Sequence, residues 1–260
     1  MGDERASFLS ETFGLGGRRA LVTGGSSGIG RAIALGLARA GATVLIAART
    51  ESAIDEVVAR GAADGGALAG IRADLSTRAG AHALADAVEA AGDVDIVVNS
   101  AGINLRPPMP ELDEASWDTT MAVNLEAPFV LGQRLIPGMA ARGYGRVIHI
   151  SSQQAQRPFA SSGAYGVSKA GLEALARSQA EAWSPQGVTA NVLVPGFVRT
   201  ALNERLSSDP RAVRALAART LIGRNGEPDD FTGPAIFLAS PASAYITGQT
   251  IPVDGGFSVH

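Results

Sequence analysis

The sequence predicts an α/β fold in which a doubly wound parallel sheet of about seven strands is flanked by helices. Three observations predict it. Short apolar runs alternate with helical patterns along the chain, a glycine-rich loop follows the first strand, and no linker or change of composition divides the chain. Repeated strand–helix units of this kind build a parallel sheet with helices on both faces. We therefore expect residues 1–260 to form a single domain, with residues 1–17 as a loose leader.

The composition is typical of a globular enzyme. Hydrophobic residues make up 46% of the chain, charged residues 18% and aromatic residues 5%, and the formal net charge is −3, which argues against a disordered chain. No basic run suits a nucleic-acid or membrane surface, and no apolar run reaches the roughly 18 residues of a membrane span. The N-terminus lacks the apolar region of a secretory signal. We therefore expect a cytoplasmic protein that binds neither nucleic acid nor membrane.

Metal and thiol chemistry are not expected. The chain has no cysteine, which excludes disulfides, thiolate catalysis and cysteine-ligated zinc. The three histidines, His82, His149 and His260, are scattered and begin no metal-ligand spacing. The sequence therefore predicts no metal site.

The first strand, loop and helix carry the clearest local pattern. Residues 19–24 read as a short strand, and a glycine cluster at 24–30 follows at once. An apolar helical face over 32–40 and a second buried strand at 43–47 come next. The glycines permit a tight turn, let the backbone approach a pyrophosphate, and leave its charge at a helix N-terminus. The alternative is a tight connection without a ligand, but the position between strand and helix favours the start of a dinucleotide-binding Rossmann fold.

The alternation continues to the C-terminus. A third strand is expected to end at 71–74, and further strands to cover 94–99, 146–151, 189–194 and 249–253. Helices are expected over 76–91, 113–121, 124–142, 163–183 and 228–239. An arginine-rich stretch at 199–224 interrupts this rhythm, and we expect it to form a mobile lid over the site.

Residues 151–169 hold the candidate chemistry. Tyr165 and Lys169 are four residues apart, so they share one face of the expected helix. A lysine beside a tyrosine favours the phenolate and lowers the pKa of the phenol, which makes the tyrosine a usable general acid or base. Ser152 stands at the carboxyl end of the preceding strand, where ligands bind in open α/β sheets. Tyrosine–lysine pairs at this spacing are also common without any catalytic role.

Taken together in chain order, several motifs resemble the short-chain dehydrogenase/reductase family. They are residues 23–30 (TGGSSGIG), 99–102 (NSAG), Asn124, Ser152, Tyr165 with Lys169, Pro195-Gly196 and residues 253–256 (VDGG). Ser100 departs mildly from the paired asparagines that the family usually carries.

The resemblance implies four catalytic residues. Tyr165 is expected to exchange a proton with the carbonyl or alcohol oxygen, and Ser152 to orient and polarise that oxygen. Lys169 is expected to lower the pKa of the tyrosine and to hold the nicotinamide ribose. Asn124 is expected to occupy a helix irregularity and to hold a water of a proton relay. The alternatives are a strand-end cap for Ser152 and a helix cap for Asn124.

The resemblance also implies a nicotinamide cofactor. The implied cofactor-binding residues are Gly24, Ser26, Ser27, Gly28, Ile29, Gly30, Arg49, Thr50, Asp74, Leu75, Asn99, Ala101, Gly102, Tyr165, Lys169, Pro195, Gly196, Val198 and Thr200. Among them, Asp74 is expected to contact the adenine and Asn99 the region of the adenosine ribose. A solvated turn carboxylate is the alternative for Asp74.

The end of the second strand favours NADP(H) over NAD(H). Ala48 stands where NAD-preferring relatives carry an aspartate that binds the ribose 2′-hydroxyl. Arg49 follows, and its guanidinium suits a 2′-phosphate, to which Ser26, Ser27 and Thr50 would add hydroxyl contacts. An exposed or adenine-stacked Arg49, or a ribose contact from Glu51, would leave NAD(H) possible.

Asn104, Arg106, Ser152, Gln154 and Tyr165 are the expected substrate-binding residues, with Gln153 and Phe159 as further candidates. Segments 101–106, 150–154 and 219–228 look like those of gluconate 5-dehydrogenases and related sugar-acid reductases, which favours a polar, anionic carbonyl or alcohol substrate. A 3-oxoacyl-thioester reductase on the same scaffold is the competing enzyme. A catalytically silent NADP-binding sensor is the alternative from another class, although intact Ser152, Tyr165 and Lys169 disfavour it.

The resemblance finally implies a homotetramer. Family members pair through the helices that precede and follow the catalytic strand, here 124–142 and 163–183, and through the C-terminal tail at 249–260. Apolar residues on several sides of the second helix, such as Leu172, Leu175 and Trp183, agree with burial beyond one core face.

Overall fold

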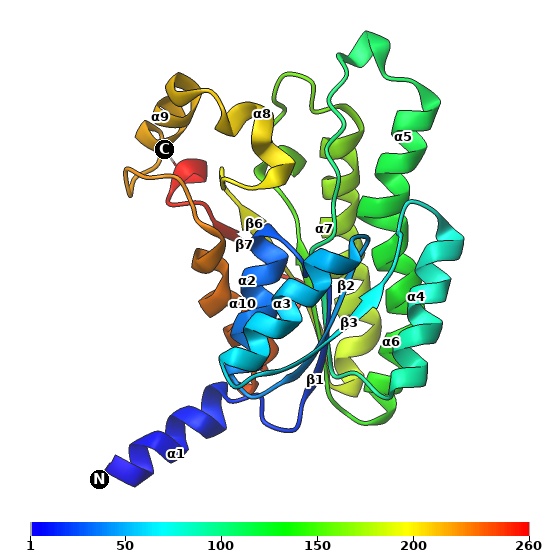
Figure 1. The fold of residues 1–260 in the computed structure, drawn as a ribbon, viewed down its shortest axis with the longest axis vertical. Coiled ribbons are helices and arrows are strands. Elements are labelled where there is room, and N and C mark those ends of the chain that lie inside the picture. Colours follow the sequence, from blue (N-terminus) through cyan, green and yellow to red (C-terminus); the bar gives the residue numbers. More distant parts are fainter. Residues whose placement is uncertain (1, 260) are drawn as a thin grey trace.

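One sheet of seven parallel strands forms the centre of the computed structural model, which describes residues 2–259 (Figure 1). The strands are β1 (Arg19–Thr23), β2 (Thr43–Ala48), β3 (Ala67–Arg72), β4 (Ile96–Asn99), β5 (Gly145–Ile150), β6 (Val188–Pro195) and β7 (Thr250–Val253). Their order across the sheet is β3-β2-β1-β4-β5-β6-β7. From β1 to β3 the strands are added toward one edge of the sheet, and from β4 to β7 toward the other edge. The switch point between β1 and β4 is where ligands bind in open α/β sheets. The predicted fold class is confirmed.

Helices cover both faces of the sheet (Figure 1). One face carries α2 (Gly28–Arg39), α3 (Glu51–Ala63) and α10 (Thr232–Ala239). The other carries α4 (Arg78–Ala91), α6 (Ala127–Ala141) and α7 (Gly163–Trp183), and α5 (Glu114–Met121) packs beside α7. This arrangement leaves the carboxyl ends of the strands, and the loops that follow them, free to build a site.

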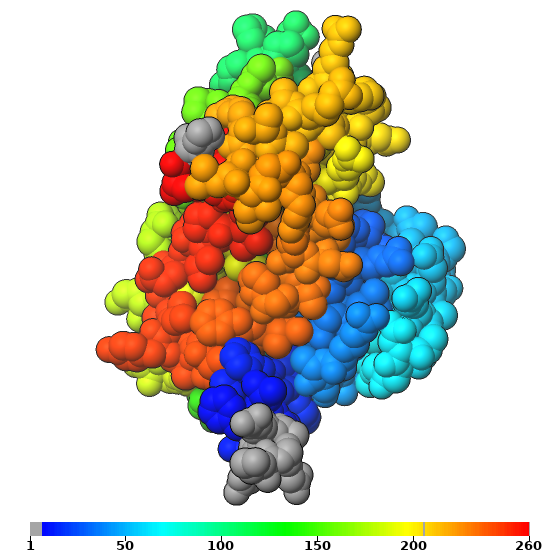
Figure 2. Space-filling model, turned by 90° about the vertical axis from the view of Figure 1, so that its left-hand side faces the viewer, coloured from blue at the N-terminus to red at the C-terminus, as the bar shows by residue number. Residues whose placement is uncertain are grey.

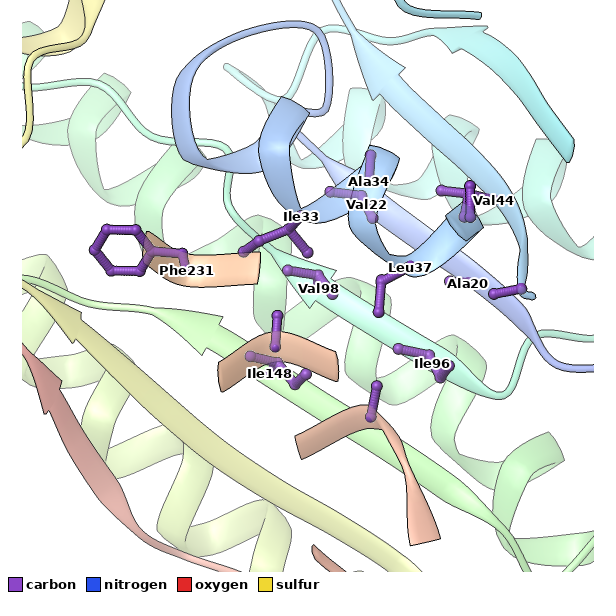
Figure 3. Packing of buried hydrophobic residues seen from close by; sticks show 14 of the residues in the cluster. Ala20, Val22, Ile33, Ala34, Leu37, Val44, Ile96, Val98, Ile148 and Phe231 are labelled. Carbon is purple, nitrogen blue, oxygen red and sulfur yellow. The ribbon is translucent and has the colours of Figure 1, made fainter. Parts of the chain in front are cut away.

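The side chains of β1 point alternately to the two faces of the sheet and pack against the helices on both. Ala20 and Val22 face the α2 side, where Ile33 and Leu37 are fully buried against them (Figure 3). Leu21 faces the opposite side and packs in the cluster of α4 and α6. Successive strand residues point to opposite faces, so one short strand is buried on both. Truncating Leu37 to alanine would cost about 2–5 kcal/mol of stability, which indicates how firmly α2 holds the loop at its N-terminus.

The structure corrects the predicted leader. Residues Gly2–Phe13 form a helix, α1, which projects from the body and packs against the short turn Pro241–Ser243 (Figure 1). Glutamate, arginine, alanine and leucine in this segment prefer the helix, which explains why it is not loose. Met1 and His260, the ends of the predicted domain, lie outside the described residues.

Other boundaries differ less. The third strand ends at Arg72 rather than at Asp74, and α3 was not among the expected helices. The predicted lid contains α8 (Glu204–Ser207) and α9 (Pro210–Ala218). The segment that follows α9 lies beside the C-terminal residues, where the Ile222 N–H donates to the Gly255 carbonyl, and the two form one surface (Figure 2). Of the helices formed by residues 2–259, none combines the length and the apolar character that crossing a membrane requires.

Candidate active site

A cleft with two lobes lies at the carboxyl ends of the strands. The larger lobe has a volume of about 550 Å³ and the smaller one about 320 Å³. Gly24, Ser27, Ala101 and Gly102 line both lobes, so the two are continuous. These residues follow β1 and β4, the strands on either side of the switch point. The cleft is therefore where the topology predicts a ligand site.

Ser152, Tyr165 and Lys169 all line the larger lobe. Ser152 follows β5 and caps a short 3-10 turn, where its Oγ accepts a hydrogen bond from the Gln154 N–H at 3.2 Å. Tyr165 and Lys169 lie on the first two turns of α7 and are 5% and 3% exposed. The Lys169 Nζ donates to the Ile150 carbonyl at 2.8 Å and lies 5.7 Å from the centre of the Tyr165 ring. The strand end and the helix thus bring the predicted groups together.

The groups that influence the pKa of Tyr165 differ from those that the sequence predicted. Burial raises the pKa of its phenol, while the Ser152 hydrogen bond and the Arg106 charge lower it. Burial lowers the pKa of Lys169 to about 8, because its ammonium is taken out of water. The sequence-based expectation named Lys169 as the group that lowers the pKa of Tyr165. In the structure the influences that oppose burial come from Ser152 and Arg106, while the Lys169 amine donates to the Ile150 carbonyl.

Asn124 occupies the expected helix irregularity. A π-helical turn, Ala122–Glu126, joins α5 to α6 and contains it, and such turns are frequent at functional sites. Its Oδ1 accepts from the Ile103 N–H at 2.9 Å, and its Nδ2 donates to the Ile103 carbonyl and to Ser168 Oγ, both at 3.0 Å. A Cβ added to Gly102 would lie 3.5 Å from both Asn124 Oδ1 and Lys169 Nζ. Asn124 therefore stands beside the lysine, with its amide fully engaged.

The glycine-rich loop needs its glycines for geometric reasons. Gly28 begins α2 with φ +51°, in the left-handed region that favours glycine. A Cβ on Gly30 would come within 2.4 Å of the Gly24 carbonyl oxygen, so a side chain there would push the loop apart. Thr200 stands over this loop, with its Cγ2 3.1 Å from the position of a Gly28 Cβ. Backbone N–H groups at this helix start suit a phosphate.

The smaller lobe gathers the residues expected to read the adenosine half. Ser26, Arg49, Thr50, Asp74 and Leu75 all line it. The Asp74 carboxylate accepts from the Ser76 N–H at 3.0 Å, and this bond, the Ser76 hydroxyl and the Arg49 charge lower the pKa of Asp74. Arg49 is exposed and forms no ion pair among the residues that the structure describes. Its guanidinium is thus available to an anion.

Four predicted site residues do not line either lobe: Gly28, Asn99, Asn104 and Asn124. Asn99 differs most from its prediction, because it is 3% exposed and its Nδ2 donates to His149 Nδ1 at 3.2 Å. His149 is its partner in the β4–β5 register. Asn99 therefore supports the sheet below the cleft, and its Oδ1 is buried with no hydrogen-bond partner among residues 2–259.

The outer part of the larger lobe contains polar groups without partners. The Nε of Arg106 and the Oε1 of Gln153 are buried and have no hydrogen-bond partner among the described residues, and both residues line the lobe. The Oδ1 of Asn104 is in the same state near the cleft. Gln154 Oε1, by contrast, accepts from Ser162 Oγ at 2.8 Å. Within residues 2–259, the lobe is lined by Arg106, Lys169 and Arg219 and by no acidic side chain.

The expected lid at 199–224 supplies most of an apolar roof of the larger lobe, and its apolar inner side was not predicted. The members of the roof are Phe197, Leu202, Leu206, Ala212, Ala215 and Leu216. The spacing of Ala212, Ala215 and Leu216 is that of one helix face, and this was the available signal.

Comparisons with known proteins agree with this geometry. A family model described as Enoyl-(Acyl carrier protein) reductase matches residues 24–258. The "Gluconate 5-dehydrogenase" of Gluconobacter oxydans (strain 621H) is 36% identical over 253 residues, which cover 96% of this chain and 98% of that protein. The "Rhamnolipids biosynthesis 3-oxoacyl-[acyl-carrier-protein] reductase" of Pseudomonas aeruginosa is 39% identical over 251 residues, covering 94% and 98%.

Solved structures extend the similarity to the fold. A putative NAD(P) dependent gluconate 5-dehydrogenase from Beutenbergia cavernae, with bound NADP at low occupancy, superposes with a TM-score of 0.93 at 41% identity, covering 96% of this chain and all of that one (100%). A gluconate 5-dehydrogenase from Burkholderia cenocepacia J2315, in complex with NADP and tartrate, gives a TM-score of 0.91 at 38% identity, covering 97% and 99%.

Proposed function

Because the chain belongs to the short-chain dehydrogenase/reductase family, we propose that it is an NADP(H)-dependent oxidoreductase that interconverts a secondary alcohol and a ketone in a small, hydroxylated, anionic substrate. The observation that carries the proposal is that Ser152, Tyr165 and Lys169 line one lobe, which is continuous with the glycine-rich loop. The proposal treats residues 1–260 as one dinucleotide-binding and catalytic unit, with 199–224 as its lid.

The residues of the smaller lobe fit NADP(H). The loop of Gly24 and Gly30 would hold the pyrophosphate, and Arg49 with Ser26 and Thr50 would hold the 2′-phosphate. Thr50 begins α3 without a side-chain cap bond, so its hydroxyl is not committed to that helix. The NADP in the two related structures supports this choice. NAD(H) remains the second cofactor, because Glu51 stands next to Thr50 and a carboxylate suits a free ribose hydroxyl.

The catalytic residues act on the substrate oxygen. NADPH, when bound, supplies a hydride to the carbonyl carbon. The Ser152 hydroxyl would donate a hydrogen bond to the carbonyl oxygen, and Tyr165 would give its phenolic proton to that oxygen as negative charge develops there. Lys169, which is charged below its pKa of about 8, would stabilise the phenolate that remains. In the oxidation direction, the same phenolate would accept the alcohol proton.

The outer part of the larger lobe supports a hydroxylated acid as the substrate. The Arg106 Nε, which has no hydrogen-bond partner among the described residues, is a charged donor for a carboxylate, and the Gln153 Oε1, in the same state, is an acceptor for a hydroxyl group. A lining with three basic and no acidic side chains among residues 2–259 favours a negative charge in the ligand. The tartrate in one related structure, a hydroxy acid, agrees with this chemistry.

The roof favours a second candidate, a 3-oxoacyl-thioester reductase. Leu206, Ala212 and Leu216 present an apolar surface to the lobe, and such a surface suits an acyl chain. The relative from Pseudomonas aeruginosa has this activity in its name. The polar groups of the lobe that lack partners among the described residues would form hydrogen bonds with the carboxylate and hydroxyl groups of a sugar acid. We therefore rank the thioester second.

We further propose a homotetramer. Phe129 on α6 and Val167 on α7 are 39% and 49% exposed on the two helices that the family resemblance assigns to the interface. A tetramer would cover them. Light scattering at micromolar concentration tests this, and a monomer would contradict it.

The first experiment compares NADPH oxidation by the wild type and by Tyr165→Phe. The carbonyl panel contains 5-ketogluconate, an acetoacetyl thioester and a bulky aryl ketone. We expect wild-type turnover of 5-ketogluconate and a loss of about 10²–10⁴ in rate for the variant, the range of a removed general acid. A preference for the thioester would select the second candidate. NADPH binding without turnover of any carbonyl would instead support the NADP-binding sensor.

A further inference from the structure

Glu173 is a buried carboxylate that the mechanism above does not use. It lies on α7 one turn beyond Lys169 and is 6% exposed. Among the described residues no arginine, lysine or histidine forms an ion pair with it. A buried charge without a counter-ion is costly unless hydrogen bonds satisfy it. Its bonds therefore indicate what the carboxylate does.

Two donors from one segment converge on this carboxylate. Ser151 Oγ donates to Glu173 Oε1 at 2.9 Å, and Gln156 Nε2 donates to Oε2 at 3.4 Å. The Ser151 hydroxyl also lies 3.3 Å from the Lys169 carbonyl, but it has a single proton, and the shorter bond is the one to the carboxylate. The carboxylate thus spans the two ends of residues 151–156.

Residues 151–156 contain the substrate-facing side of the site. Ser152, Gln153 and Gln154 line the larger lobe. The backbone before Ser152 is already fixed, because the Ser151 N–H donates to the Leu193 carbonyl on β6 and Lys169 Nζ holds the Ile150 carbonyl. Lys169 already connects this strand end to α7 through the Ile150 carbonyl, and the contact with Glu173 adds a second connection, at Ser151, next to the substrate-facing residues.

We propose that Glu173 is a positioning residue, which acts through Ser151 to fix Ser152 relative to Tyr165 on α7. The proposal rests on the roles given to Ser152 and Tyr165 in the proposed function. Both groups must reach the same carbonyl oxygen, and a misplacement of about 1 Å can cost on the order of 100-fold in rate. A carboxylate suits the task because it only accepts hydrogen bonds and can serve both donors at once.

The kinetic test uses Glu173→Leu, Ser151→Ala and the double variant, with Glu181→Leu as the matched control. Glu181 is an exposed glutamate on the same helix. With 5-ketogluconate and NADPH we expect kcat to fall about 10- to 100-fold in each single variant, with the KM for NADPH unchanged. The double variant should lose no more than the worse single variant, because both changes remove one connection. Glu173→Gln retains an acceptor oxygen and should restore most of kcat.

Two readouts separate positioning from a loss of packing. NADPH deuterated at the transferred position should give a larger isotope effect on kcat in Glu173→Leu than in Glu181→Leu, because the chemical step becomes slower. Amide hydrogen exchange over 151–157 should accelerate in Glu173→Leu and not in the control. Additive losses, an unchanged isotope effect or unchanged exchange would overturn the proposal. If the wild type reduces no carbonyl, the proposed function fails, while the exchange measurement still decides whether Glu173 holds the segment.

Discussion

The floor and the roof of the larger lobe are built on different principles. The floor consists of the end of β5 and the first turns of α7, where Ser152, Tyr165 and Lys169 are each at most 9% exposed. The Lys169 amine donates to a backbone carbonyl, and Ser152 accepts from the loop that follows it. The roof is formed largely by α8 and α9, and Leu216 on α9 is only half-buried. Buried side chains that form hydrogen bonds, like those of the floor, are held in one geometry. Helices that are less buried, like those of the roof, are freer to move.

The difference separates chemistry from selectivity. A proton transfer needs atoms fixed within a fraction of an ångström, which the sheet and α7 supply. A substrate must enter and leave, which the segment at 199–224 would allow. Floor substitutions should therefore abolish turnover of every substrate, whereas roof substitutions should change which substrate is preferred.

Lys169 gives the sharpest test of the floor. Lys169→Met should lower kcat for all carbonyls by about 100-fold or more, because the phenolate of Tyr165 loses its charged neighbour. Lys169 is the single lysine of the chain, so selective ¹³C labelling of lysine gives one side-chain signal. Its titration midpoint should lie near pH 8. A midpoint near that of free lysine would show that the floor is open to water.

The same residue fixes a pH dependence of stability. Its pKa is lower in the folded protein, at about 8, than the ordinary 10.5. Between these values the unfolded chain binds more protons, so the free energy of unfolding should rise with pH by on the order of 3 kcal/mol. In Lys169→Met this rise should be absent, as measured by urea unfolding of the cofactor-free protein.

Arg106 lines the larger lobe, and its removal should affect charged and uncharged substrates unequally. Arg106→Gln should lower kcat/KM for 5-ketogluconate about 10- to 100-fold, the worth of a charged hydrogen bond, and change it little for an uncharged aryl ketone. Arg106 also lowers the pKa of Tyr165, so the pH profile of the remaining activity should move to higher pH. Equal losses for charged and uncharged substrates would show that Arg106 serves the floor instead of the substrate.

The floor was predictable from the sequence because its residues recur at fixed spacing on regular elements. A strand end, a four-residue helical interval and the order of the motifs were enough to bring Ser152, Tyr165 and Lys169 together. Asn99 shows where such prediction ends. Its side chain turns toward His149, its register partner on β5, and strand order must be known before that pairing is visible.

The apolar face of the roof was less predictable, because it too depends on where elements lie in three dimensions. Leu206, Ala212 and Leu216 lie in a segment whose composition resembles an exposed helix. Only the three-dimensional position of α8 and α9 over the cleft reveals that their apolar side faces a ligand cavity. The missing hydrogen-bond partners of Gln153 and Arg106 are likewise a property of packing and not of sequence.

Leu216 tests whether the roof selects substrates. Leu216→Ser should shift the ratio of kcat/KM values from thioester toward 5-ketogluconate about tenfold, the usual worth of one apolar contact. The kcat for the preferred substrate should stay within a few fold of the wild-type value. Leu221→Ser is the control, because Leu221 is 64% exposed and does not line the lobe. If both variants change the ratio equally, the roof does not contact the substrate.

Substitution of His149 should have the smallest effect on activity. It separately tests whether the strand beneath the floor is closed to water. Its neutral ring accepts from Asn99 Nδ2 and donates through Nε2 to Gln179 Oε1 at 2.8 Å. Burial lowers its pKa from 6.5 to about 4, against a raising effect of the Gln179 bond. Because the folded pKa is depressed, the stability is complete above pH 6.5 and is lost as pH falls toward 4, by on the order of 3 kcal/mol.

His149→Gln should remove this part of the acid sensitivity and leave kcat at pH 7 within a few fold, since the ring touches no reacting atom. The measurement is the free energy of unfolding from pH 7 to pH 4, compared with His82→Gln, a change at an exposed histidine. Equal pH dependence in the two variants would mean that water reaches His149. The floor would then be as open as the roof, and the contrast between the two regions would lose its physical basis.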